Sequence, residues 1–178
     1  MKRPFPLGLL FALSAVVALS AIAAAAVPPA LAPLDFLLGR WSSPGTSTPG
    51  GATGEAEFSR DLQDQVIVRR SYAEYEVAAG APARRHDDLM VIYAQGDSLR
   101  ADYFDSEGHV IRYRVRAPEA GRAVFLSEAM AGQPQFRLSY VLEPSGALKG
   151  SFEMAPPNAP GAFKPYLQWE GTKAPAEK

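Results

Sequence analysis

The chain has 178 residues, no cysteine, and 18 basic against 19 acidic side chains, which gives a formal net charge of −1. This balance argues against nucleic-acid binding, which needs a basic surface. Without cysteine, the chain has neither a disulfide framework nor a lipid anchor attached to that residue. The length suits a single domain that buries its own core.

The N-terminus carries Lys2 and Arg3, followed by an apolar run over 7–26 that ends in alanines before Val27. A basic start, an apolar middle and a small-residue end are typical of a signal peptide. An uncleaved transmembrane anchor is the alternative, because the run approaches the length that spans a bilayer. The alanine ending favours cleavage, so we predict that 1–26 is a signal peptide. The protein is then periplasmic or secreted, with no membrane anchor after cleavage.

Residues 27–33 contain three prolines and are predicted to form an extended leader. The next stretch, 34–41, has the sequence Leu-Asp-Phe-Leu-Leu-Gly-Arg-Trp. It predicts a short amphipathic helix that ends at Gly39, where glycine accepts a backbone conformation that strains other residues. We expect this helix to plug one end of a β-barrel, with Trp41 sealing that end. Residues 42–54 are mostly Ser, Thr, Pro and Gly, which predicts a mobile loop at the barrel mouth.

Short segments of alternating apolar and polar residues follow, separated by turn residues, as in an all-β sandwich or barrel. The predicted strands are 52–59, 65–76, 88–95, 99–105, 109–116, 123–128, 135–143, 148–154 and 163–170. Turn sequences such as Gly96-Asp97 and Pro144-Ser145-Gly146 favour hairpins between consecutive strands.

We therefore predict an all-β protein: a single up-and-down antiparallel β-barrel of about nine or ten strands with a short N-terminal helical plug. The barrel should cover 34–171, and closing it removes exposed strand edges. The polar tail 172–178 is expected to be disordered.

Alternate residues of a strand face opposite sides, so one row of each strand should line the barrel interior. The predicted inner rows are His109, Ile111, Tyr113 and Val115; Phe136, Leu138, Tyr140 and Leu142; and Leu148, Gly150, Phe152 and Met154. Strands 65–76 and 99–105 mix polar and apolar residues in both rows.

A lumen that takes a ligand keeps a few polar groups inside to orient it. Our candidate ligand-binding residues are Arg70, Tyr72, Tyr103, His109 and Tyr113. The alternative is that the arginines extend over the outer surface and the tyrosines only fill the core.

Gly39-x-Trp41 before a run of strands resembles the opening motif of the calycins, the superfamily of lipocalins, fatty-acid-binding proteins and nitrobindin-like barrels. Ala101-Asp102-Tyr103 is similar to the Thr-Asp-Tyr element of lipocalins, and the opening 34–41 looks like that of uncharacterised exported bacterial domains of the same barrel type. The resemblance implies a barrel with a small ligand in its lumen. It also implies an arginine stacked on the tryptophan, for which the last predicted strand offers Lys164.

The resemblance to nitrobindin-like barrels would add haem, held by a histidine near the C-terminus. This chain has no histidine after His109, so we expect no haem and no other cofactor.

The chain has two histidines. His86 lies in a charged segment, 84–88, in which His-Asp-Asp could bind a cation weakly. Its spacing matches no recognised metal site, so no metal is expected. His109 follows the acidic segment 105–108; carboxylates beside a histidine can make it a proton-transfer group, and the alternative is a turn in which they cap backbone amides. The sequence contains no Gly-x-Ser-x-Gly nucleophile motif and no phosphate-binding glycine-rich loop.

The function expected from the sequence is an exported barrel that binds a small apolar or amphipathic ligand in its lumen. One alternative is an enzyme that uses His109 with a nearby carboxylate for acid–base chemistry. Another is a structural envelope protein with a filled core, and the volume of the lumen separates it from the ligand-binding barrel.

Overall fold

The computed structural model describes residues 28–45, 51–75 and 84–175. These residues form a 3-10 helix, η1 (Pro29–Leu37), and ten strands that close into one antiparallel barrel. The strands are β1 Gly39–Pro44, β2 Thr53–Asp61, β3 Val66–Tyr75, β4 Arg84–Gln95, β5 Ser98–Asp105, β6 Val110–Glu119, β7 Arg122–Ser127, β8 Gln135–Leu142, β9 Leu148–Ala155 and β10 Lys164–Lys173. The predicted all-β, up-and-down barrel with a helix at its N-terminal side is confirmed.

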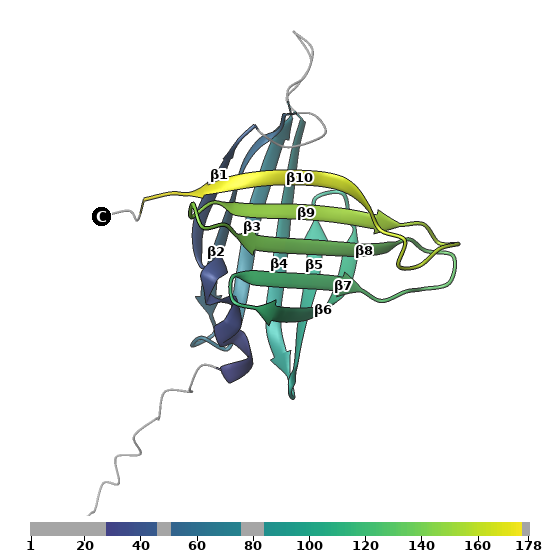
Figure 1. Ribbon diagram of the computed structural model, residues 1–178, viewed down its shortest axis with the longest axis horizontal. Helices are drawn as coiled ribbons and strands as arrows, with labels where there is room; N and C mark the ends of the chain where they lie inside the picture. Colours follow the sequence, from purple (N-terminus) through teal and green to yellow (C-terminus); the bar gives the residue numbers. More distant parts are fainter. Residues whose placement is uncertain (1–27, 46–50, 76–83, 176–178) are drawn as a thin grey trace, which may run out of the picture.

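Each strand pairs with its neighbours in the chain, and β1 pairs with β10 to close the barrel. Figure 1 shows β7 to β10 crossing in front of β2 to β5, so these two groups of strands form opposite walls of the barrel. The tight hairpin turns depend on glycine: Gly96 and Gly146 have φ angles of +58° and +86°, which side chains other than glycine rarely adopt.

The helix η1 closes one end of the barrel. Leu31, Leu34 and Leu37 have no exposed surface and belong to the main hydrophobic core. Gly39, with φ +113°, redirects the chain from the helix into β1. Trp41 is 4% exposed, and its indole Nε1 donates a hydrogen bond to the Leu37 carbonyl at 2.7 Å. Gly39 and Trp41 thus lie where η1 passes into β1.

The leader predicted over 27–33 is wrong for 29–33, which belong to η1. Proline is tolerated at the start of a helix, where the first N–H groups have no intrahelical acceptor. Leu31 then turns inward, and the burial of its side chain outweighs the preference of proline for extended backbone. The predicted signal peptide 1–26 lies outside the described residues.

Two segments predicted to be irregular are partly strand. Residues 42–44 of the predicted loop belong to β1, and 46–50 lie outside the described residues. Residues 53–54, where the predicted loop overlaps the predicted strand 52–59, belong to β2. At the other end of the chain, 172–173 belong to β10, and the Ala174 amide donates to the Arg40 carbonyl at 2.8 Å. Residues 176–178 of the predicted disordered tail also lie outside the described residues. The polar composition misled the prediction, because closing the barrel pairs these backbone groups whatever the side chains are.

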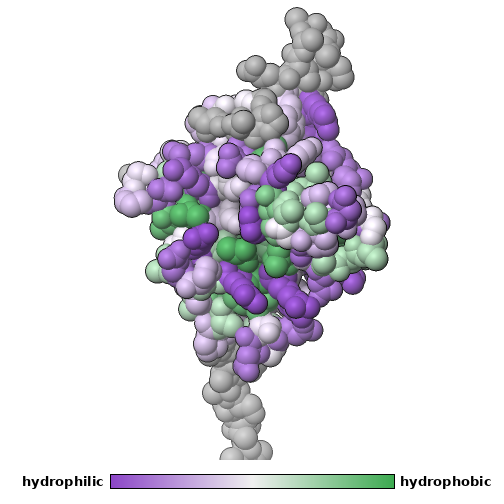
Figure 2. Space-filling view, turned by 45° about the vertical axis from the view of Figure 1, so that its right-hand side comes forward, coloured by the Kyte–Doolittle hydropathy of each residue, from purple (hydrophilic) through white to green (hydrophobic). Residues whose placement is uncertain are grey.

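The faces of three strands were predicted correctly. Tyr113 and Val115 of β6 are buried, whereas the alternating residues Arg112, Arg114 and Arg116 are exposed. The predicted inner rows of β8 and β9 likewise contribute Leu138, Tyr140 and Leu148 to the core. On the face drawn in Figure 2, hydrophilic side chains predominate and apolar ones form small patches between them.

Candidate functional site

A large cavity occupies the lumen at the end of the barrel away from η1. Its volume is about 1190 Å³, and it extends to the strand ends at Thr53, Tyr75, Val110 and Met154. Much of its wall is aromatic or aliphatic, with Phe58, Phe136, Leu138, Tyr140, Phe152 and Trp169 among the lining residues. The rings meet edge to face, as in the pairs Phe58–Tyr140 and Tyr140–Trp169 at 5.5 and 6.0 Å between centroids. The cavity therefore has a largely aromatic and aliphatic wall, with charged side chains among its other lining residues.

A buried polar cluster lies on the wall of this chamber. Arg69 of β3 is 5% exposed, and its Nη2 lies 2.5 Å from Oδ1 of Asp88 on the neighbouring strand β4. Its Nη1 donates to the hydroxyl of Tyr140 on β8, across the lumen. Ser71 donates to Asp88 Oδ2 at 2.6 Å. Both oxygens of Asp88 are therefore engaged, which is the condition for burying a charge.

The cluster keeps Arg69 charged. Burial acts to lower its pKa, but the Tyr140 hydroxyl and the Asp88 carboxylate outweigh burial, so the pKa of Arg69 lies above its ordinary value. The Nε of Arg69 is buried and has no hydrogen-bond partner within the described part of the chain. One donor of a charged group that lines the cavity is thus left unpaired.

Two of the predicted ligand-binding residues, Tyr103 and Tyr113, line this cavity. The guanidinium of Arg69 lies 5.7 Å from the centre of the Tyr103 ring. Tyr113 is 2% exposed and packs edge to face on Phe125. Burial raises the pKa of both phenols above the ordinary value, so both hydroxyls stay protonated and able to donate.

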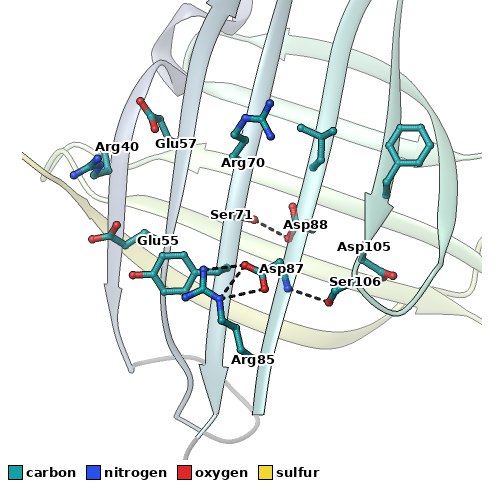
Figure 3. Close-up of a pocket in the computed structure, with 13 residues that line it drawn as sticks. Arg40, Glu55, Glu57, Arg70, Ser71, Arg85, Asp87, Asp88, Asp105 and Ser106 are labelled. Carbon is teal, nitrogen blue, oxygen red and sulfur yellow. Dashed lines mark hydrogen bonds and ion pairs between the residues drawn. The ribbon is translucent and has the colours of Figure 1, made fainter. Parts of the chain in front are cut away.

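The predicted lumen position of Arg70 is wrong, and Tyr72 only borders the lumen. Arg70 is exposed and sits opposite Glu57 of β2 on the outside of the barrel, as Figure 3 shows. Tyr72 stacks against the guanidinium of Arg85 at 4.0 Å and borders both the lumen and an outer depression of about 520 Å³. The inner polar residues of β3 are Arg69 and Ser71.

The sequence left this strand ambiguous because both of its rows mix arginine with apolar residues. Asp88 of β4 indicates which row of β3 faces the lumen, because it pairs directly with Ser71 of β3. It becomes visible only once β3 and β4 are aligned.

A second polar cluster lies at the rim of the cavity and contains both histidines. His109 was predicted to face inward, but its side chain is 65% exposed in the turn between β5 and β6. Its Nδ1 lies 2.9 Å from Asp105 Oδ2. His86 of β4 places Nε2 3.1 Å from the Tyr103 hydroxyl and Nδ1 3.5 Å from Glu107.

The carboxylate of Asp105 is 5% exposed and is held by the turn that follows it. Its Oδ1 accepts the backbone N–H groups of Glu107 and His109 at 3.0 and 2.9 Å. Burial acts to raise the pKa of Asp105, but these hydrogen bonds and the imidazole of His109 outweigh it, so the pKa lies below the ordinary value. The capping turn and the histidine–carboxylate contact, weighed as alternatives from the sequence, are present together.

No protein-family model and no curated protein matches the chain. The closed antiparallel barrel of ten strands is consistent with a calycin-like fold.

The Trp41 ring has a cation over it, 5.3 Å from its centre. This cation is Lys173, which pairs with Trp41 across the closing strands β1 and β10. Lys164, which the last predicted strand has in place of the arginine of lipocalins, lies opposite Met154 of β9. Among the described residues, no helix is long and apolar enough to cross a membrane.

Proposed function

We propose that this protein is an exported calycin-like barrel that binds one small apolar or amphipathic molecule in its lumen. The observation that supports the proposal is the open cavity of about 1190 Å³ with an aromatic wall. Ligand sites of roughly 300–1000 Å³ with apolar walls and a few polar groups are the usual form of small-molecule pockets. A structural protein with a filled core would have no need of such a space.

The polar cluster favours an uncharged oxygen on the ligand. Arg69 already has a counter-charge in Asp88, so a carboxylate ligand would have to displace that partner or bring a second negative charge into the lumen. A carbonyl, ether or hydroxyl oxygen could instead accept from a tyrosine hydroxyl on the cavity wall, such as that of Tyr103 or Tyr113. The ligand class is thus a mostly apolar molecule with a neutral polar group.

A neutral fluorescent probe, N-phenylnaphthylamine, tests the proposal. We expect its emission to rise when it enters the lumen, and we expect Tyr113→Ala to weaken its binding because this side chain lines the cavity. Arg114→Ala is the matched control, since Arg114 is the adjacent residue on the same strand and is exposed. Absence of probe binding by the unmodified protein, or equal effects of the two substitutions, would contradict the proposal.

Acid–base catalysis by His109 is a second candidate function, which the contact of its Nδ1 with Asp105 favours. That contact uses Nδ1 and orients the ring, so Nε2 is the nitrogen that would transfer the proton. A panel of aryl esters tests this candidate: turnover that His109→Ala abolishes, without loss of probe binding, would support it. Turnover that is equal in the variant would remove it.

Export is proposed on the sequence of 1–26. Cell fractionation followed by N-terminal sequencing tests it, with a start near Val27 in the soluble exported fraction as the expected result. Recovery of the full-length chain only with the membranes would refute it.

A further inference from the structure

The two histidines of this chain converge on one carboxylate at the mouth of the cavity. His86 Nδ1 lies 3.5 Å from Glu107 Oε1, and His109 Nδ1 lies 3.9 Å from Glu107 Oε2. Asp105 Oδ2 lies 2.9 Å from His109 Nδ1. One donor atom from each of His86, Asp105 and Glu107 lies within 4.8 Å of the others. Strand β4 and the β5–β6 turn thus bring together two imidazoles and two carboxylates that are scattered in the sequence.

We propose that His86, Asp105, Glu107 and His109 form a binding site for one divalent transition-metal ion of the Zn²⁺ type. Bonds of about 2.0–2.1 Å in a tetrahedral zinc site separate the ligand atoms by roughly 3.3 Å. One donor atom each of His86, Asp105 and Glu107 lies within 4.8 Å of the others, so the atoms of this group need to close by at most about 1.5 Å to reach that spacing. His109 would join them from its contacts of 2.9 Å with Asp105 and 3.9 Å with Glu107. Two carboxylates and two neutral imidazoles would also balance the charge of the ion.

Neighbouring hydrogen-bond partners orient the donor atoms of this cluster, as they do in metal sites. A ligating histidine usually gives its second ring nitrogen to a hydrogen-bond partner, which fixes the tautomer. The hydroxyl of Tyr103 is that partner for His86: it lies 3.1 Å from Nε2 and can itself donate to Asp105 Oδ2 at 3.4 Å. Nδ1 of His86 is then left to face Glu107.

Asp105 is positioned in the same way. Its Oδ1 is occupied by the two backbone N–H groups of the turn, which leaves Oδ2 directed toward His109. The cation that competes for this cluster is Arg84, whose guanidinium lies 3.7 Å from Glu107 Oε1. Its side chain is 72% exposed and can turn into solvent when an ion binds.

The donor set also predicts selectivity. Calcium and magnesium prefer sites made entirely of oxygen, whereas imidazole nitrogen favours zinc and its neighbours among the transition metals. This departs from the expectation based on sequence spacing, because the spacing of His86 alone cannot reveal a partner in another hairpin. The proposal does not depend on a ligand in the lumen.

Isothermal titration calorimetry tests the site, on protein purified without a histidine tag, treated with EDTA and dialysed. We expect about one equivalent of Zn²⁺ to bind and Ca²⁺ and Mg²⁺ to bind far more weakly. His86→Ala and His109→Ala should each weaken Zn²⁺ binding at least about 10-fold, since even residues that only support a ligand typically contribute 10–100-fold.

Glu119→Gln is the matched control, because this exposed carboxylate pairs with Arg122 in the separate β6–β7 hairpin. It should leave the affinity for Zn²⁺ unchanged, and circular dichroism should show every variant folded. Absence of Zn²⁺ binding, an affinity that neither histidine substitution changes, or Ca²⁺ binding as tight as that of Zn²⁺ would overturn the proposal.

Discussion

Replacing Asp88 by alanine should destabilise the protein strongly, because it leaves the buried guanidinium of Arg69 without its counter-charge. Charges about 4 Å apart at an effective dielectric constant of about 20 attract by about 4 kcal/mol. Breaking a buried pair by removing one partner typically costs about 3–5 kcal/mol. Since the side chain of Asp88 is 11% exposed, the expected loss lies near the lower end, at about 3 kcal/mol.

The double variant Arg69→Met/Asp88→Ala should recover much of this loss, since it removes both charges together. Urea denaturation of the wild type, the two single variants and the double variant gives the coupling free energy, which we expect to be at least about 2 kcal/mol. The exposed pair Arg114–Glu128 is the matched control and should show a coupling below about 1 kcal/mol. If the losses of stability from the two single substitutions simply add in the double variant, lumen water screens the two charges. Arg69 and Asp88 would then not be a buried ion pair.

Trp41→Ala should lower the free energy of unfolding by about 3–5 kcal/mol, because it removes a 4%-exposed ring and the hydrogen bond to Leu37. A loss below about 1 kcal/mol, measured by urea denaturation, would place Trp41 outside the core. Gly150→Ala should place a Cβ against the Trp169 ring and push that ring into the lumen. Fluorescence should then show a shift in tryptophan emission, whereas unchanged emission would show that the ring does not lie against Gly150. Asp105→Ala should cost about 1–3 kcal/mol at pH 7. Folding lowers the pKa of Asp105 below the ordinary aspartate value of 3.8. The stability difference between wild type and variant should therefore be full above pH 3.8 and shrink as the pH falls further. A stability difference that stays constant between pH 7 and about pH 3 would argue against the turn contacts.

The barrel could be predicted from the sequence because its signals are local. In β6, exposed arginines alternate with apolar residues such as Tyr113, and a period of two fixes the inner face once one face is polar. Glycine-containing turns such as the one at Gly146 set the hairpins in the same local way. The closing strands were missed in part because the pairing of Trp41 with Lys173 joins the two ends of the chain, and composition alone cannot show it.

The site was harder to predict because its decisive contacts are non-local. Arg69 is identified as the inner arginine by Tyr140 on the opposite wall, and no periodicity within β3 distinguishes it from Arg70. Likewise, the relation of His86 to Glu107 depends on the alignment of β4 with β5. Tyr103 and Tyr113 do line the cavity, as expected. For Tyr113 the signal was the alternation of exposed arginines with apolar residues in its strand.

The most direct test of the central claim is a chemical-shift map of where N-phenylnaphthylamine binds, recorded by NMR on the isotopically labelled protein. A ligand-binding lumen predicts that the largest changes occur at lumen residues such as Tyr113, Leu138 and Phe152, with little change at the exposed residues Arg114 and Arg116. Changes confined to the outer face, or no changes at saturating probe, would contradict a ligand-binding lumen.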